Sequence, residues 1–253
     1  MPISASSKFA ALYKKEMREV VPEILVVAGM SVLILILMVT IDSRFTPILI
    51  MPLISLMGLT IFLPVVSSFK MISREWTTNS IYLTLSLPVK GASVLGSKLS
   101  ALLTVALIGM VITSVTGLIM GLSFASDIGE VYRQLAARIT PEQRVELLKG
   151  AIMIFFIIFA IIAYIINISF FSQVTGRLVK RGAGLLTAFV FIVTLWIMGK
   201  VMATIWQGLS QVQMVDNLTP PLQLMGINLA VVLLMAVIAF VAAILVYDHR
   251  VEL

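Results

Sequence analysis

Long apolar segments alternate with short polar ones along the whole chain. Six of the apolar segments have about the 20 residues that a helix needs to cross a bilayer; they lie near residues 23–41, 47–68, 99–124, 149–172, 183–206 and 226–247. Within them, hydrophobic positions follow one another without the polar alternation of a membrane β-barrel strand. Because hydrocarbon offers no partners to backbone amides and carbonyls, such segments predict helices. We therefore predict an all-α membrane protein, a six-transmembrane-helix bundle that forms a single transmembrane domain over residues 1–253.

Composition supports this prediction. Hydrophobic residues make up 60% of the 253 residues and charged residues 12%, with a mean hydropathy of +1.11. In a soluble domain, about half of the residues are apolar and about a quarter are charged. The absence of cysteine excludes disulfides and thiolate metal sites. We attribute the net charge of +6 to topology signals and to contact with the lipid bilayer, and expect no nucleic acid partner.

Basic residues predict the orientation of the bundle. Membrane proteins keep an excess of Lys and Arg in their cytoplasmic loops. Five bases lie in the first and third loops, namely Arg44, Arg133, Arg138, Arg144 and Lys149. Twelve lie in the termini and in the second and fourth loops, namely Lys8, Lys14, Lys15, Arg18, Lys70, Arg74, Lys90, Lys98, Arg177, Lys180, Arg181 and Arg250. We expect a multi-pass protein of the cell membrane with both termini cytoplasmic.

Residues 1–22 are predicted to contain an amphipathic helix that lies in the membrane interface. At 100° per residue the apolar side chains share one face, and the charged ones, which include Lys14, Lys15 and Arg18, occupy the rest. Glu16 falls in the middle of the apolar arc. Two interpretations remain open: Glu16 snorkels from a helix that anchors to the membrane surface, or it meets a protein partner or another cytoplasmic loop.

The third loop, residues 125–148, is predicted to be an external helical loop. Asp127 with Glu130 forms one capping pattern, and Thr140 with Gln143 forms a stronger one because Pro141 occupies the first helical position. We expect a short external helix, a break near Thr140, and then a helix that runs into the fourth span. The loop is either a structural lid or a gate on a substrate path.

The second loop, residues 69–98, has the most distinctive sequence. Arg74, Glu75 and Trp76 are expected just beyond the second span. A short amphipathic helix is predicted from about Asn79 to Leu87, where Pro88 ends it. We expect a rigid cytoplasmic helix mounted on two membrane helices. The residues that we assign to this coupling loop are Arg74, Glu75, Trp76, Thr77, Thr78, Asn79, Ser80, Tyr82, Leu83 and Pro88.

This loop resembles the first cytoplasmic loop in the permease subunits of ABC-2 type transporters, which are bacterial ABC exporters. The sequence pattern of that loop contains Leu-Pro-Val and Gly-Lys-Leu elements. Trp76 stands where that pattern has Arg, and Asn79 where it has Gly; Asn tolerates the left-handed backbone better than most residues. The positions that fit are Glu75, Ser80, Leu85, Leu87, Pro88, Val89, Gly96, Lys98 and Leu99. The six spans and the N-terminal interface helix extend the resemblance over nearly the whole chain.

The resemblance implies a permease that forms half of a translocation pathway. In that family the loop helix is a coupling helix docked on a separate ABC ATPase subunit, and a second permease chain, identical or different, completes the pathway. ATP and Mg would then bind to the partner ATPase, and we expect no cofactor in this chain. The predominantly apolar spans favour an amphipathic or hydrophobic substrate: a peptide, lipid or drug. The alternative is a non-transporting membrane scaffold or immunity protein.

Chemistry within this chain is disfavoured by its residues. The segment 91–98 approaches a Walker A loop, but Ser97 stands where that loop requires Lys. A metal-dependent intramembrane hydrolase needs clustered His and carboxylates, and the sole histidine is His249. The polar residues Asn167 and Asn228 lie within the spans, where they either form helix-to-helix hydrogen bonds of about 1 kcal/mol or contact substrate. We therefore expect a protein that is not itself an enzyme.

Overall fold

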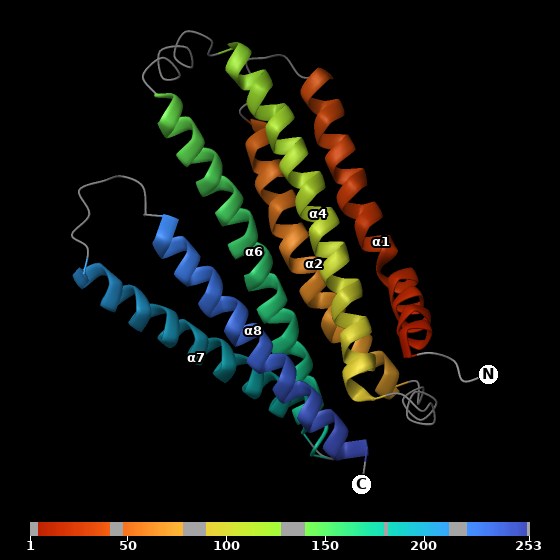
Figure 1. The fold of residues 1–253 in the computed structure, drawn as a ribbon. Coiled ribbons are helices and arrows are strands. Elements are labelled where there is room, and N and C mark those ends of the chain that lie inside the picture. The colour runs from red at the N-terminus through yellow and green to blue at the C-terminus, as the bar shows by residue number, and fades with distance from the viewer. Residues whose placement is uncertain are drawn as a thin grey trace.

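The computed structural model describes residues 5–40, 48–77, 90–127, 140–179, 182–212 and 222–251. Six long helices account for nearly all of these residues, and no strand occurs among them (Figure 1). Each helix contains a segment long and apolar enough to cross a membrane, which confirms the predicted six-helix membrane fold. Their bounds are α1 (Ala5–Thr40), α2 (Ile50–Thr77), α4 (Gly91–Asp127), α6 (Pro141–Gly176), α7 (Ala183–Val212) and α8 (Leu222–Val251).

Successive helices run up and down, so the start of α1 and the end of α8 lie at the same end of the bundle (Figure 1). We call this the terminal end. Several helices extend past the apolar segments that predicted them: α2 continues to Thr77 and α4 begins at Gly91. Hydropathy detects the part of a helix that lies in hydrocarbon, whereas backbone hydrogen bonding continues into the polar turns that follow. Arg74 and Glu75 therefore lie in the last turns of α2 and not beyond it.

The predicted interface helix and the first span form one helix. α1 is continuous from Ala5 to Thr40 with Pro22 inside it, and its ribbon changes direction towards the N-terminus (Figure 1), as a proline within a helix causes. The apolar face that we assigned to the membrane surface instead packs on protein: Tyr13 and Met17 lie against the buried core, and the Tyr13 hydroxyl is 3.0 Å from Oγ1 of Thr104 in α4.

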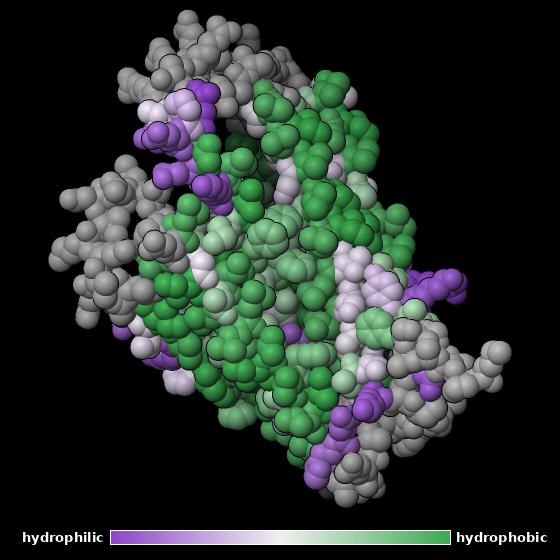
Figure 2. All heavy atoms as spheres, viewed as in Figure 1, coloured by the Kyte–Doolittle hydropathy of each residue, from purple (hydrophilic) through white to green (hydrophobic). Residues whose placement is uncertain are grey.

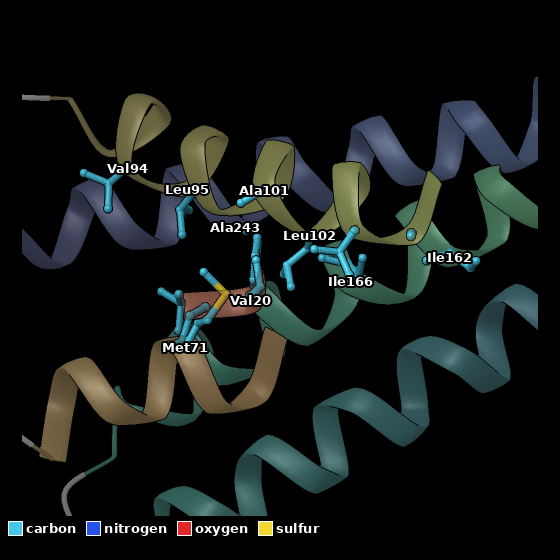
Figure 3. Packing of buried hydrophobic residues seen from close by; sticks show 14 of the residues in the cluster. Val20, Met71, Val94, Leu95, Ala101, Leu102, Ile162, Ile166 and Ala243 are labelled. Carbon is cyan, nitrogen blue, oxygen red and sulfur yellow. The ribbon is translucent and has the colours of Figure 1, made fainter. Parts of the chain in front are cut away.

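Buried hydrophobic side chains form three separate cores. One lies among α6, α7 and α8 and includes Tyr164 and Val232; another lies among α1, α2 and α4 and includes Leu56 and Met120. The largest core lies nearer the terminal end and draws side chains from α1, α2, α4, α6 and α8 (Figure 3). The two groups of helices are therefore joined mainly through this core.

The outward faces of the helices are apolar, as Figure 2 shows for one side of the molecule. α7 is the most peripheral helix: it packs chiefly against α6. Its exposed stripe consists of Leu185, Phe189, Ile192 and Trp196, a helical spacing that places these side chains on one face. Exposed apolar surface of this extent requires lipid as its solvent.

Polar side chains bridge the helices inside the bundle. The hydroxyls of Thr60 and Thr113 are 2.8 Å apart, and the Ser68 hydroxyl donates to Ser169 at 2.7 Å. Asn167 Nδ2 donates to the carbonyl of Ala236 in α8 at 3.2 Å, which is the helix-to-helix bond expected as one of its two roles. Asn228 is also buried, but its Oδ1 has no hydrogen-bond partner among the described residues.

The start of α6 confirms one of the two capping patterns. Thr140 is the N-cap, its side chain accepts the Gln143 N–H, the Gln143 side chain accepts the Thr140 N–H, and Pro141 is the first helical residue. From there α6 runs unbroken through the predicted fourth span. Glu130, from the first capping pattern, lies outside the described residues, so the short external helix stays a prediction.

The close approach of the start of α7 to the end of α6 offers a test of the packing. A Cβ added to Gly176 would lie 2.8 Å from the carbonyl oxygen of Ala183, whereas a Cβ on Gly184 would meet nothing within 4 Å. We expect Gly176→Ala to lower the free energy of unfolding by about 1–3 kcal/mol through overpacking, and Gly184→Ala to leave it unchanged or raise it slightly. Thermal unfolding of the two variants in one detergent measures this; equal midpoints would contradict the close approach at Gly176.

Candidate functional site

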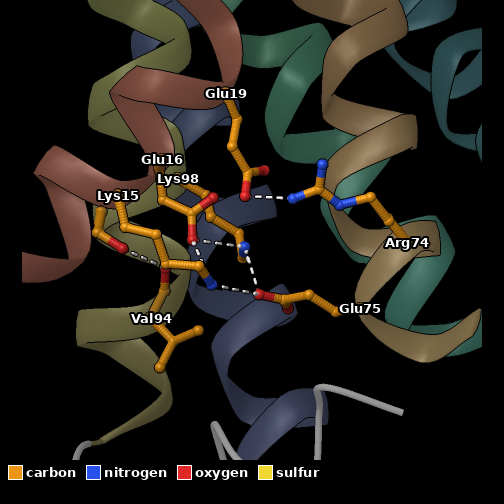
Figure 4. A network of polar contacts seen from close by, with 8 residues as sticks. Lys15, Glu16, Glu19, Arg74, Glu75, Val94 and Lys98 are labelled. Atoms are coloured by element: carbon orange, nitrogen blue, oxygen red, sulfur yellow. Dashed lines mark hydrogen bonds and ion pairs between the residues drawn. The ribbon is translucent and has the colours of Figure 1, made fainter. Parts of the chain in front are cut away.

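A cluster of buried charges lies at the terminal end of the bundle. Lys98 of α4 places its Nζ 3.1 Å from Oε1 of Glu16 in α1 and 2.8 Å from Oε1 of Glu75 in α2 (Figure 4). The three residues are only 1%, 2% and 7% exposed, respectively. We call Glu16, Glu75 and Lys98 the charge cluster. It joins three helices through one ammonium group.

Each helix brings its charged residue inward together with apolar neighbours. Val20 of α1, Met71 of α2 and Leu95 of α4 lie within two turns of the cluster residues along their own helices and belong to the largest buried core. A charge in such surroundings is unfavourable unless it is paired and hydrogen-bonded. The Lys98 ammonium group donates a hydrogen bond to each of the two carboxylates, so all three buried charges are paired.

Lys15 balances the second negative charge. Its Nζ lies 3.6 Å from Oε1 of Glu16 and 3.8 Å from Oε1 of Glu75, and its side chain is half exposed. Two carboxylates therefore face two ammonium groups, one buried and one at the surface. A half-exposed pair is screened by solvent and contributes little, so Lys98 supplies most of the stabilisation.

Further polar contacts join α1 to α2 next to the cluster. Arg74 forms an ion pair with Glu19, and the Ser67 hydroxyl donates to Oε1 of Glu23 (Figure 4 shows the first). Glu16, Glu19 and Glu23 are spaced by three and four residues, which puts them on one face of α1. Ser67, Lys70 and Arg74 have the same spacing on α2, and together with Glu19 and Glu23 of α1 they line a small hollow between the two helices.

The structure brings some of the predicted site residues together and separates others. Glu75 is in the charge cluster, Arg74 is paired with Glu19, and Trp76 and Thr77 complete the last turn of α2. The remaining predicted coupling-loop residues lie outside the described residues: Thr78, Asn79, Ser80, Tyr82, Leu83 and Pro88.

Of the interface-helix residues, Lys14 and Arg18 are exposed, whereas Glu16 is buried. This burial excludes the interpretation that Glu16 snorkels to the membrane surface. Its partner is Lys98, at the C-terminal end of the second loop. This contact agrees with the alternative that Glu16 meets protein. Asn167 and Asn228 lie in α6 and α8 and have no part in the charge cluster.

Sequence reasoning identified Glu16 and Glu75 but missed the side chain that joins them. The sequence places Lys98 in the loop motif and among the predicted cytoplasmic bases, whereas the structure buries its ammonium group. The available signal was Glu16, an acid in an apolar arc that requires a buried base. Glu19 and Glu23 were also missed, although their spacing from Glu16 marks one helix face.

The interactions of this site are ion pairs and hydrogen bonds between helices. Within the described ranges, no three acidic or histidine side chains converge to form a metal site. The two carboxylates of the charge cluster are balanced by Lys98 together with Lys15. What the cluster can do is keep the ends of α1, α2 and α4 in fixed relation.

Comparisons of the chain with protein-family models, with curated proteins and with solved structures find no match.

Removal of the buried ammonium group tests the charge cluster. We expect Lys98→Met to lower the free energy of unfolding by about 3–5 kcal/mol, because two buried carboxylates then lose their shared partner. Lys14→Met, at an exposed position of α1, is the matched control and should change it by less than about 0.5 kcal/mol. Thermal unfolding in detergent measures both.

A charge-free variant separates electrostatics from packing. Lys98→Met combined with Glu16→Gln and Glu75→Gln removes the uncompensated charges and should recover most of the lost stability, as replacement of buried ion pairs by neutral groups often does. If Lys98→Met alone were as stable as Lys14→Met, the charge cluster would not hold these helices together.

Proposed function

We propose that this chain is the permease subunit of an ATP-driven ABC exporter and is coupled to a separate ATPase subunit. The observation that supports the proposal is the position of the charge cluster relative to the second loop. Glu75 lies two residues before the end of α2, and Lys98 lies seven residues after the start of α4. Both flanks of the motif-bearing loop are thus fixed to each other and, through Glu16, to α1.

This geometry suits the transmission of force from a partner. A displacement of the loop between α2 and α4 moves both helix ends, and the buried contacts with Glu16 require α1 to follow. Packed helices respond to such a displacement as rigid bodies. ATP binding in the partner shifts the bundle between two states to the extent that the ATPase binds one state more tightly.

The remaining parts of the proposal concern assembly and substrate. ATP and Mg bind to the partner ATPase, and two permease chains, identical or different, together enclose the pathway, of which this chain forms half. The apolar faces of the helices suit an amphipathic or hydrophobic substrate such as a peptide, lipid or drug. A non-transporting scaffold or immunity protein is the competing function; it would need the bundle but no ATPase.

Capture of the ATPase tests the proposal. We expect the chain to co-purify in mild detergent with the ATPase encoded beside its gene. Leu83→Pro should abolish this capture because proline breaks the predicted loop helix, while Leu83→Met should retain it. Both variants leave the charge cluster intact and should unfold at the temperature of the unaltered chain. Capture that survives Leu83→Pro would contradict docking through the loop helix, and absence of any ATPase would favour the scaffold.

Chemical labelling tests the proposed orientation. The chain has no cysteine, so single cysteines report their own positions. Glu146, near the start of α6, and Val179, just after its end, are both exposed. With cytoplasmic termini, a membrane-impermeant maleimide added to intact cells should label Glu146→Cys, and should label Val179→Cys only after permeabilisation. The reverse pattern would invert the topology.

A further inference from the structure

The C-terminal end of α8 meets the start of α4. α8 packs along α6 for most of its length and contacts α4 much less extensively. At this meeting point the backbone N–H of Gly91 donates to Oδ1 of Asp248 at 3.1 Å. Gly91 is the first residue of α4, so its N–H has no acceptor within the helix. A carboxylate at this position also complements the positive end of the helix dipole.

Gly91 is needed for this approach. A Cβ at position 91 would lie 2.6 Å from Cδ1 of Tyr247 and 3.2 Å from Cγ of Asp248, which is too close for the ring. Tyr247 is 7% exposed and shares its core with Val94, so its ring is confined. Gly96 lies one and a half turns further along α4, and a Cβ there would make ordinary contacts at 3.7 and 4.0 Å.

We propose that Asp248 is a positioning residue that fixes the exit of the second loop to α8. The charge cluster ties the loop's flanks to α1. The bond from Gly91 to Asp248 ties the exit to α8, which is packed on α6. A displacement of the loop thereby reaches the second group of helices as well as the first. The functional consequence of this attachment rests on the proposed coupling to an ATPase.

Amide hydrogen exchange tests the attachment without any partner. Loss of one hydrogen bond of about 1 kcal/mol should raise exchange in the first turn of α4 about fivefold. We expect this rise in Asp248→Ala, a smaller one in Asp248→Asn, which keeps an acceptor oxygen, and none in His249→Ala, its exposed neighbour. Gly91→Ala should reproduce the effect of Asp248→Ala, and Gly96→Ala should not. Unchanged exchange in Asp248→Ala and Gly91→Ala overturns the attachment.

The response of the ATPase tests its role. Asp248→Ala should capture the ATPase as well as the unaltered chain does, yet stimulate ATP hydrolysis about fivefold less, again the factor of one hydrogen bond. Loss of fold would instead reduce capture as well. Faster exchange with undiminished stimulation overturns the positioning role. If the unaltered chain captures no ATPase, the proposed exporter function fails, and with it the role in coupling, whereas the exchange result still decides the attachment itself.

Discussion

The burial of one ammonium group between two carboxylates constrains the whole terminal end of the bundle. If Lys98 separated from Glu16 and Glu75, these buried charges would lose their ion pairs in an apolar environment. Each unpaired charge there is unfavourable by several kcal/mol. Because the three residues belong to α1, α2 and α4, none of these helices can shift alone at this end. The surrounding core excludes water and so strengthens the constraint.

Away from this end the bundle is held differently. α1, α2 and α4 keep one core and α6, α7 and α8 another. In lipid, no hydrophobic driving force brings helices together, so close packing and hydrogen bonds must do so. There, bonds such as that between Thr60 and Thr113 join helices within one group. The bond from Ser68 to Ser169, which joins α2 to α6 across the groups, lies beside the largest core. Firm attachment at one end and separate cores beyond it are the architecture that rigid-body motion requires.

Several of the contacts between helices converge on the two ends of the second loop. The loop's entry is held by Glu75 and its exit by Lys98 and, through Gly91, by Asp248. In the exporter that we propose, a partner acting on this loop would therefore act on most of the bundle at once. In a scaffold the same contacts would hold the helices in place. Binding of an ATPase distinguishes the exporter from the scaffold.

The six helices and the N-cap at Thr140 could be predicted from sequence, because hydrocarbon sets the length and pairing of a span and a cap is formed by residues three positions apart. The acid within the apolar arc at Glu16 was visible too, but its partner was not. Lys98 is 82 residues from Glu16 and 23 from Glu75. Asp248 is 157 residues from Gly91. Hydrophobic periodicity says which face of a helix is buried and not which helix buries it, so packing alone decided that a lysine counted among the cytoplasmic bases became the buried centre of the site.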